Sequence, residues 1–348
     1  RLTVHELLSV PGGQPLSFQG EITRQRDRFT VEGKLSTAGV DLEKLLLSVP
    51  KSRGRTPQRT SLASWPVDGH VAVEAGFVAF RGYRIEPLVG TFTLDRGKLT
   101  GEIAKAEICG LSAPLSATYA AGEVDVSIRL TARGTPLQQS VDCLTRGRLV
   151  ATGTSDLNAA FTARGPIDAL VPSARGRFEL VSRDGQIQSS LVVRRILALV
   201  ALLNLAPASL ATENVPYDAM TLSAALEERG LVIERATLDS RAIAMVMRGT
   251  VALPGEQLDL SGVVSPVGTL NRIVNAIPII GCLFSTPIAA VPFGVRGTID
   301  DPLVIPLQPT ALLESVATDL GNLLSAPVRM IAPVIDRGRA PTDAGSRQ

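Results

Sequence analysis

A two-residue alternation of apolar and polar side chains recurs along this chain and limits what it can fold into. Residues 123–130 (EVDVSIRL) alternate without a fault, which places Val124, Val126, Ile128 and Leu130 on one side of an extended strand. Further segments with the same pattern contribute Phe92 and Leu94, Phe178 and Leu180, Ile233, Met245 and Met247, and Leu258 and Leu260. Each such strand has one apolar face, so the chain must shelter a long apolar surface.

Short turn signals separate these segments. They occur at 95–97 (DRG), 121–122 (AG), 183–185 (RDG), 228–230 (ERG) and 254–256 (PGE). A spacing of about ten residues leaves little room for crossover helices, which favours antiparallel pairing. The sequence therefore predicts a mainly β fold, a long, twisted and curled antiparallel sheet shaped like a groove, with a few short amphipathic helices. The helices are predicted at 40–49, 189–205, 266–277 and 310–324.

The composition argues against an enzyme and against nucleic-acid binding. The 35 Lys and Arg residues nearly balance 33 Asp and Glu residues, so a net charge of +2 gives no general attraction to nucleic acid. Nucleophile-elbow, phosphate-loop, zinc-protease and dinucleotide-binding motifs are missing from the sequence. His5 and His70 are its two histidines, and neither cofactor nor metal is expected. Hydrophobic residues make up 45% of the chain but aromatic residues only 4%, so the apolar surface is aliphatic.

Three other features leave alternatives open. Cys109 and Cys143 lie in strand-like sequence, where they form either a disulfide, which indicates an oxidising compartment, or two buried thiols. The apolar stretches 196–212 and 273–295 approach membrane length, but prolines interrupt them, so buried or interfacial segments are expected. The basic residues 51–60 fit a solvated loop, or else a contact with an anionic headgroup or nucleic acid.

The second half of the chain carries motifs that occur together in a known family. They are GRFEL at 176–180, GTV at 249–251, PVGTL at 266–270, IPIIG at 277–281 and GTIDDP at 297–302. In this order they resemble the AsmA-like C-terminal region, with YhdP-type members the nearest. The resemblance covers about 174–306, and residues 65–173 match the strand repeats of the family more loosely. We therefore divide the chain into an N-terminal segment of strands, a short helix and a basic loop (1–64), a β-repeat segment (65–173), an AsmA-like region (174–308), and an amphipathic helix with a polar tail (309–348).

The resemblance implies a location and a task. Proteins of this family are envelope proteins of Gram-negative bacteria, anchored in the inner membrane by an N-terminal helix. They cross the periplasm as a curled sheet with an apolar groove, and they resemble bridge-like lipid transfer proteins whose cargo is phospholipid. This chain begins without such an anchor, so we expect it to correspond to the membrane-distal part that reaches the outer membrane.

We therefore expect a non-enzymatic, lipid-binding segment that moves phospholipid between the inner and outer membranes. We expect this segment to contact both membranes and other envelope proteins. The predicted groove lining is Phe92, Leu94, Val124, Val126, Ile128, Leu130, Phe178, Leu180, Ile233, Met245, Met247, Leu258 and Leu260. The predicted membrane or partner contacts are Ile277, Ile279, Ile280, Leu283, Phe284, Leu312, Leu313, Val316 and Leu320. The lining residues fit equally well as a core between two sheets.

Two other functions compete with lipid binding. A structural or assembly factor for outer-membrane proteins would act by pairing strands along an open sheet edge. An enzyme acting on lipid or glycan would need a pocket around His70 or around an acid pair such as Asp300 and Asp301. Adjacent residues on a strand point to opposite faces, which argues against a catalytic dyad at the latter pair.

Overall fold

The computed structural model describes a set of ranges that lie within the larger of two units, Arg1–Leu307, the second unit being Gln308–Gln348. The described ranges are 2–8, 14–25, 27–48, 66–188, 191–202, 214–228, 230–241, 243–253, 255–265 and 291–307. The predicted helices at 266–277 and 310–324 and the basic residues 51–60 lie outside them.

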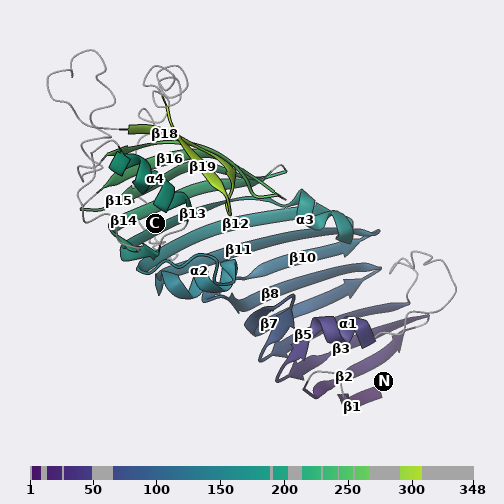
Figure 1. The fold of residues 1–348 in the computed structure, drawn as a ribbon. Coiled ribbons are helices and arrows are strands. Elements are labelled where there is room, and N and C mark those ends of the chain that lie inside the picture. The colour runs from purple at the N-terminus through teal and green to yellow at the C-terminus, as the bar shows by residue number, and fades with distance from the viewer. Residues whose placement is uncertain are drawn as a thin grey trace, which may run out of the picture. The chain divides into compact units, whose positions relative to one another are not determined.

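The described residues form nineteen strands and a few short helices (Figure 1). The strands in the first half are β1 (Leu2–Leu8), β2 (Leu16–Gln25), β3 (Arg28–Thr37), β4 (Val40–Asp41), β5 (Val67–Ala75), β6 (Val78–Phe80), β7 (Tyr83–Asp95), β8 (Lys98–Ile108), β9 (Leu111–Ser112), β10 (Leu115–Ala120) and β11 (Glu123–Pro136). Those in the second half are β12 (Thr154–Gly165), β13 (Arg175–Gln188), β14 (Asn214–Glu227), β15 (Gly230–Asp239), β16 (Ala244–Ala252), β17 (Gln257–Ser265), β18 (Val291–Thr298) and β19 (Pro302–Pro306).

The helices are α1 (Leu42–Ser48), α2 (Leu137–Thr145), α3 (Leu170–Ser173) and α4 (Leu191–Leu202), with a 3-10 turn η2 (Ile167–Ala169) before α3. The sequence predicted α1 and α4 to within a few residues, but it did not predict α2 or α3.

The strands belong to one sheet and pair largely in chain order. From β10 to β19 each strand pairs antiparallel with the next one in the chain. The prediction of a mainly β fold built on one long sheet is confirmed. The sheet is mixed rather than purely antiparallel, because β3 pairs with β5, and β4 with β6, in parallel. Parallel pairing needs a long connection, and β4 and α1 belong to the one between β3 and β5.

Two-residue turns explain why neighbouring strands pair so regularly. Four hairpins turn at an X-Gly pair in which both residues have positive φ, namely Arg81-Gly82, Arg96-Gly97, Cys109-Gly110 and Ala121-Gly122. This backbone is the type I′ turn, whose twist matches that of a β-hairpin, and glycine adopts its second position without strain. The turn chemistry therefore fixes the starting register of the hairpins β6–β7, β7–β8, β8–β9 and β10–β11.

The helices α1, α2 and α4 follow the ends of β4, β11 and β13. Cross-strand pairing places the ends of β3, β5, β8, β11 and β13 along the same edge of the sheet. We call this edge the helix rim. It includes the turn between β6 and β7, whereas α3 follows β12 at the opposite rim.

The last strands return toward α4 and close around it (Figure 1). Although α4 follows β13, it packs on β18 and β19. Arg195 of α4 pairs with Asp301 before β19 at 3.0 Å, and Arg148, which precedes β12, pairs with Glu256 between β16 and β17 at 2.8 Å. These contacts bring the C-terminal strands back over elements that lie far earlier in the chain.

Asp68 fastens the parallel pair of β3 and β5. Its carboxylate accepts hydrogen bonds from Arg28 Nε at 2.5 Å and Nη2 at 2.6 Å, and from the backbone N–H of Arg96 at 2.8 Å. These donors favour the ionised form, and they lower the pKa of Asp68 from 3.8 to about 2, with the Arg28 hydrogen bonds as the largest cause.

We expect Asp68→Asn to lower stability at neutral pH and to reduce its dependence on acid. Because the folded-state pKa is depressed, the stabilisation is complete above about pH 4 and is lost as the pH falls toward about 2. Urea midpoints measured across this window should fall less steeply in the variant than in the wild type. Asp125→Asn, an exposed change on β11, serves as the control, and an equal effect of the two would contradict the assignment.

Candidate functional site

One face of the sheet is apolar across its whole width. Residues directly opposite each other on paired strands share a face, and the row Ile103, Leu115, Ile128 and Phe161 crosses β8, β10, β11 and β12. The row of Leu157, Leu180 and Leu222 continues it into β14. Parallel rows link Ile22 of β2 to Val31 of β3 and Leu260 of β17 to Val295 of β18. We call this surface the apolar face.

Phenylalanine rings on the apolar face lie against glycines of neighbouring strands. A Cβ added at Gly101 would lie 2.8 Å from Cε1 of Phe92, and one added at Gly33 would lie 2.8 Å from Cζ of Phe18. The Phe161–Gly176 and Phe293–Gly262 pairs are arranged in the same way. A ring that lies over a glycine covers exposed backbone, as in the aromatic rescue of glycine in sheets. The pairs therefore keep the face smooth.

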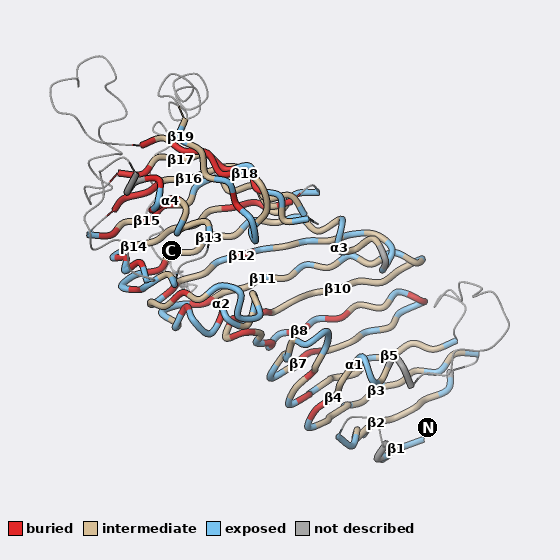
Figure 2. The backbone as a smooth tube through the Cα atoms, in the orientation of Figure 1, coloured by how far each residue is buried: buried red, intermediate tan, exposed pale blue. Residues whose placement is uncertain are grey.

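Burial divides the apolar face into an open part and a closed part (Figure 2). In β10 to β13 its large side chains, among them Leu115, Val126, Leu130 and Phe178, are half-buried. In β17 and β18 the equivalent large side chains are fully buried, with Val264, Phe293 and Val295 each 0% exposed. They form one core with Ile196, Leu197 and Leu199 of α4. The same sheet surface thus changes from half-buried to fully buried where α4 packs on it.

The predicted lining residues fall on both parts. Eight of them are half-buried, namely Phe92 and Leu94 on β7 and, on the open part over β11 and β13, Val124, Val126, Ile128, Leu130, Phe178 and Leu180. Phe92, Ile128 and Leu130 pack against a small buried cluster of Ile103, Ala106 and Ala113. Met245, Leu258 and Leu260 are buried in the closed core, and Ile233 and Met247 pack against it. Met245, Leu258 and Leu260 are therefore core residues in the structure, because α4 packs into the cluster that buries them, whereas Ile233 and Met247 stay half-buried at its margin. The structure also adds Leu115, Phe161 and Leu222 to the apolar face.

The predicted membrane or partner contacts lie outside the described residues. These are Ile277, Ile279, Ile280, Leu283, Phe284, Leu312, Leu313, Val316 and Leu320.

The opposite face of the sheet is polar and carries cross-strand ion pairs. Arg183 of β13 pairs with Asp156 of β12 at 3.1 Å, and Arg177 pairs with Glu234 of β15 at 3.7 Å. A hollow of about 770 Å³ lies on this face over β12 to β14, and the ion pair of Arg175 with Glu228 lines it. Its two other charged side chains are Arg177 and Glu227. Of these charges, Arg175 and Glu228 pair with each other, and Arg177 pairs with Glu234 outside the hollow.

The groups considered for catalysis do not converge. His70 is exposed, and its Nδ1 lies 3.0 Å from Thr93 Oγ1. Asp301 pairs with Arg195 and Asp300 lies 3.8 Å from Arg148, so both carboxylates serve the closure of the C-terminal strands. Within the described ranges, no group of three or more His, Cys, Asp or Glu side chains could hold a metal ion.

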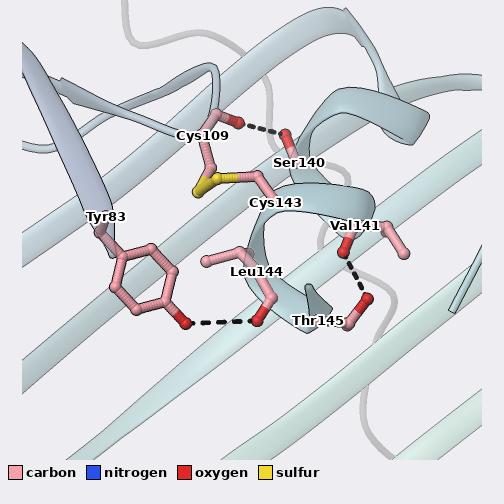
Figure 3. The surroundings of a disulfide bond; sticks show 7 residues. All are labelled: Tyr83, Cys109, Ser140, Val141, Cys143, Leu144 and Thr145. Atoms are coloured by element: carbon pink, nitrogen blue, oxygen red, sulfur yellow. Dashed lines mark hydrogen bonds between the residues drawn. A yellow bond between two sulfur atoms is a disulfide. The ribbon is translucent and has the colours of Figure 1, made fainter. Parts of the chain in front are cut away.

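A disulfide between Cys109 and Cys143 ties α2 to the turn between β8 and β9 (Figure 3). Ser140 Oγ donates a hydrogen bond to the Cys109 carbonyl at 3.0 Å, and Tyr83 Oη donates one to the Leu144 carbonyl at 3.5 Å. The helix ends at Arg146, which has left-handed backbone with φ 54°. These contacts fix the end of α2 at the helix rim, beside the start of β7.

We expect loss of this disulfide to lower the free energy of unfolding by about 2–4 kcal/mol, because the bond closes a long loop in the unfolded chain. The sequence separation of the two cysteines is 34. Denaturant melts of the wild type with and without reductant should differ by this amount. The C109S/C143S variant should match the reduced wild type and should not respond to reductant, whereas a shift of the variant by reductant would contradict this assignment.

Comparison with protein-family models, with curated proteins and with solved structures finds no match for this chain. Among the helices that the structure describes, none has the length and apolar character needed to cross a membrane.

Proposed function

We propose that this protein is a non-enzymatic lipid-binding segment, and that the acyl chains of phospholipids lie on the open part of the apolar face. In this proposal it belongs to an envelope protein that carries phospholipid between the inner and outer membranes across the periplasm. The observation that carries the proposal is the contrast in burial along one continuous face. Large aliphatic side chains stay half-buried over β10 to β13, yet they are sealed where α4 packs on the same surface.

An acyl chain suits this surface because it needs no directional partner. Each methylene removed from water contributes about 0.8 kcal/mol, so a single chain gains enough to remain bound. The backbone N–H and C=O groups of neighbouring strands bond to one another within the sheet, so they need no partner from the ligand. The Phe–Gly pairs keep the aromatic rings from protruding. Neighbouring strands lie about 4.8 Å apart, so the face offers similar apolar contact at every step. Such a surface holds a lipid without fixing its position.

The direct test is site-specific photocrosslinking in the full chain. A photoreactive residue at Val126 lies on the apolar face, and one at Ser127 lies on the polar face of the same strand. After incubation with phospholipid vesicles, we expect lipid adducts at position 126 and none at 127. Equal labelling at both positions, or none at either, would rule out the proposal.

A strand-pairing role in assembly of outer-membrane proteins is the second candidate, and one observation favours it. In the described part of the chain β1 pairs with β2 alone, which leaves its other edge free, and Leu2 on this strand is 61% exposed. A photoreactive residue at Thr3 distinguishes the two functions. Protein adducts at position 3 without lipid adducts at 126 would favour strand pairing.

A further inference from the structure

The apolar face ends at the helix rim, next to two arginines. Val78 of β6 lies opposite Ile85 of β7, which in turn lies opposite Ile108 on the apolar face. Phe80 and Tyr83 form the next pair on the same face, two residues further along each strand, so they extend the apolar face to its edge. Phe80 is 39% exposed there. The turn that joins the two strands is Arg81-Gly82, which places a cation directly after the last apolar pair.

A second cation reaches this point from a distant part of the chain. Arg146, at the end of α2, donates a hydrogen bond from Nη2 to the carbonyl of Arg81 at 3.1 Å. Its guanidinium carbon lies 5.4 Å from the centre of the Tyr83 ring, and that of Arg81 lies 5.4 Å from the centre of the Phe80 ring. The disulfide at Cys143 holds this end of the helix in place. Two guanidinium groups therefore lie beside the two rings that end the apolar face.

These arginines differ from Arg84 and Arg148 at the same rim, each of which has an acidic partner. Arg84 pairs with Glu86 at 2.5 Å, and Arg148 pairs with Glu256. Within the described ranges, no carboxylate lies within ion-pair distance of Arg81 or Arg146. A guanidinium offers several N–H donors in a plane that matches two oxygens of a phosphate. Packing of its flat face near a ring leaves these donors at the edge available.

We propose that Arg81 and Arg146 bind the phosphate of a phospholipid whose acyl chains lie on the apolar face. The inference rests on the proposed function, since it assigns the headgroup contact of the same lipid. Apolar rings followed at once by cations reproduce the order of tail and phosphate in the ligand. The exposed side chains of Leu144 and Leu149, which flank Arg146, add apolar surface around the same point.

The test compares two lipids that share acyl chains and differ in the phosphate. The full chain is incubated with phosphatidylglycerol vesicles that contain diacylglycerol, re-isolated, and its bound lipids are quantified by mass spectrometry. We expect the wild type to enrich phosphatidylglycerol over diacylglycerol relative to the vesicles. In the R81Q/R146Q variant the enrichment of phosphatidylglycerol over diacylglycerol should be about tenfold lower, because two charge-assisted contacts to the phosphate disappear. The amount of diacylglycerol bound should not change.

The matched control is R129Q/R235Q, which removes two exposed arginines from the polar face of β11 and β15 and should keep the selectivity of the wild type. Unchanged selectivity in R81Q/R146Q, or equal loss in the control, would overturn the headgroup site. A wild type that binds neither lipid would instead refute the proposed function itself. Inorganic phosphate is tested alone, and binding to wild type but not to R81Q/R146Q, together with unchanged phosphatidylglycerol selectivity in that variant, would assign a free-anion site and overturn the headgroup proposal.

Discussion

The V126E/L130E variant is expected to bind less than a tenth of the phospholipid that the wild type binds. Both side chains lie on the apolar face of β11 and both are half-buried, so the glutamates can keep their charge in water and the sheet should still form. Acyl methylenes that contact these positions in the wild type would instead face carboxylates. Losing two such contacts costs about 1.6 kcal/mol, which already exceeds a tenfold change in affinity.

The S127E/R129E variant adds the same residues to the same strand on its polar face. It should bind lipid as the wild type does, because these positions are exposed and lie away from the acyl chains. Lipid bound per protein, measured after extraction, gives the readout, and thermal melting shows whether both variants are folded. If both variants bind lipid equally, the apolar face of β11 is not where the acyl chains lie.

The alternation in the sequence was sufficient to predict the strands and their apolar side. At 123–130 it identified β11 and the four side chains that the structure places on the apolar face, because a two-residue period is a local property of an extended strand. The X-Gly turns at 96–97 and 121–122 were predicted for the same reason, since a type I′ turn depends on its own two residues.

Alternation cannot show what covers a face. Leu258 and Leu260 follow the same pattern as Val124 and Val126, yet they are buried in the core around α4 while the β11 residues remain half-buried. The difference arises from contacts between α4 and strands about one hundred residues later, which no local period encodes. The parallel pairing of β3 with β5 was missed for a similar reason, because it depends on the connection between them.

The proximity of Arg81 and Arg146 could not be predicted from local sequence either. Arg81 and Arg146 are 65 residues apart, and they meet because a disulfide fixes the end of α2. The helix itself, LQQSVDCLT, places Leu137, Val141 and Leu144 at helical spacing, but this stripe of three residues is short and the sequence-based prediction missed it. The segment Phe80-Arg81-Gly82-Tyr83 did contain a usable signal, an X-Gly turn between two aromatic residues, from which a cation beside an apolar edge could have been predicted.

Phe293→Ala and Phe92→Ala form a matched pair that measures directly whether the apolar face is open. Both rings lie over a glycine of a neighbouring strand, Gly262 and Gly101 respectively. Phe293 is 0% exposed in the closed core, so its truncation should lower the free energy of unfolding by about 3–5 kcal/mol. Phe92 is half-buried, and part of its ring already faces outward, so its truncation should cost about half as much.

Hydrogen exchange of the two variants locates the damage. Phe293→Ala should speed amide exchange in β16 to β19 and leave β7 to β11 protected, because strands of a long sheet depend mainly on their neighbours. Added phospholipid should slow exchange around Phe92 and leave the strands around Phe293 unchanged. Equal costs for the two substitutions in lipid-free protein would mean that the face over β7 is sealed as tightly as the C-terminal core, and acyl chains would then have no surface to occupy.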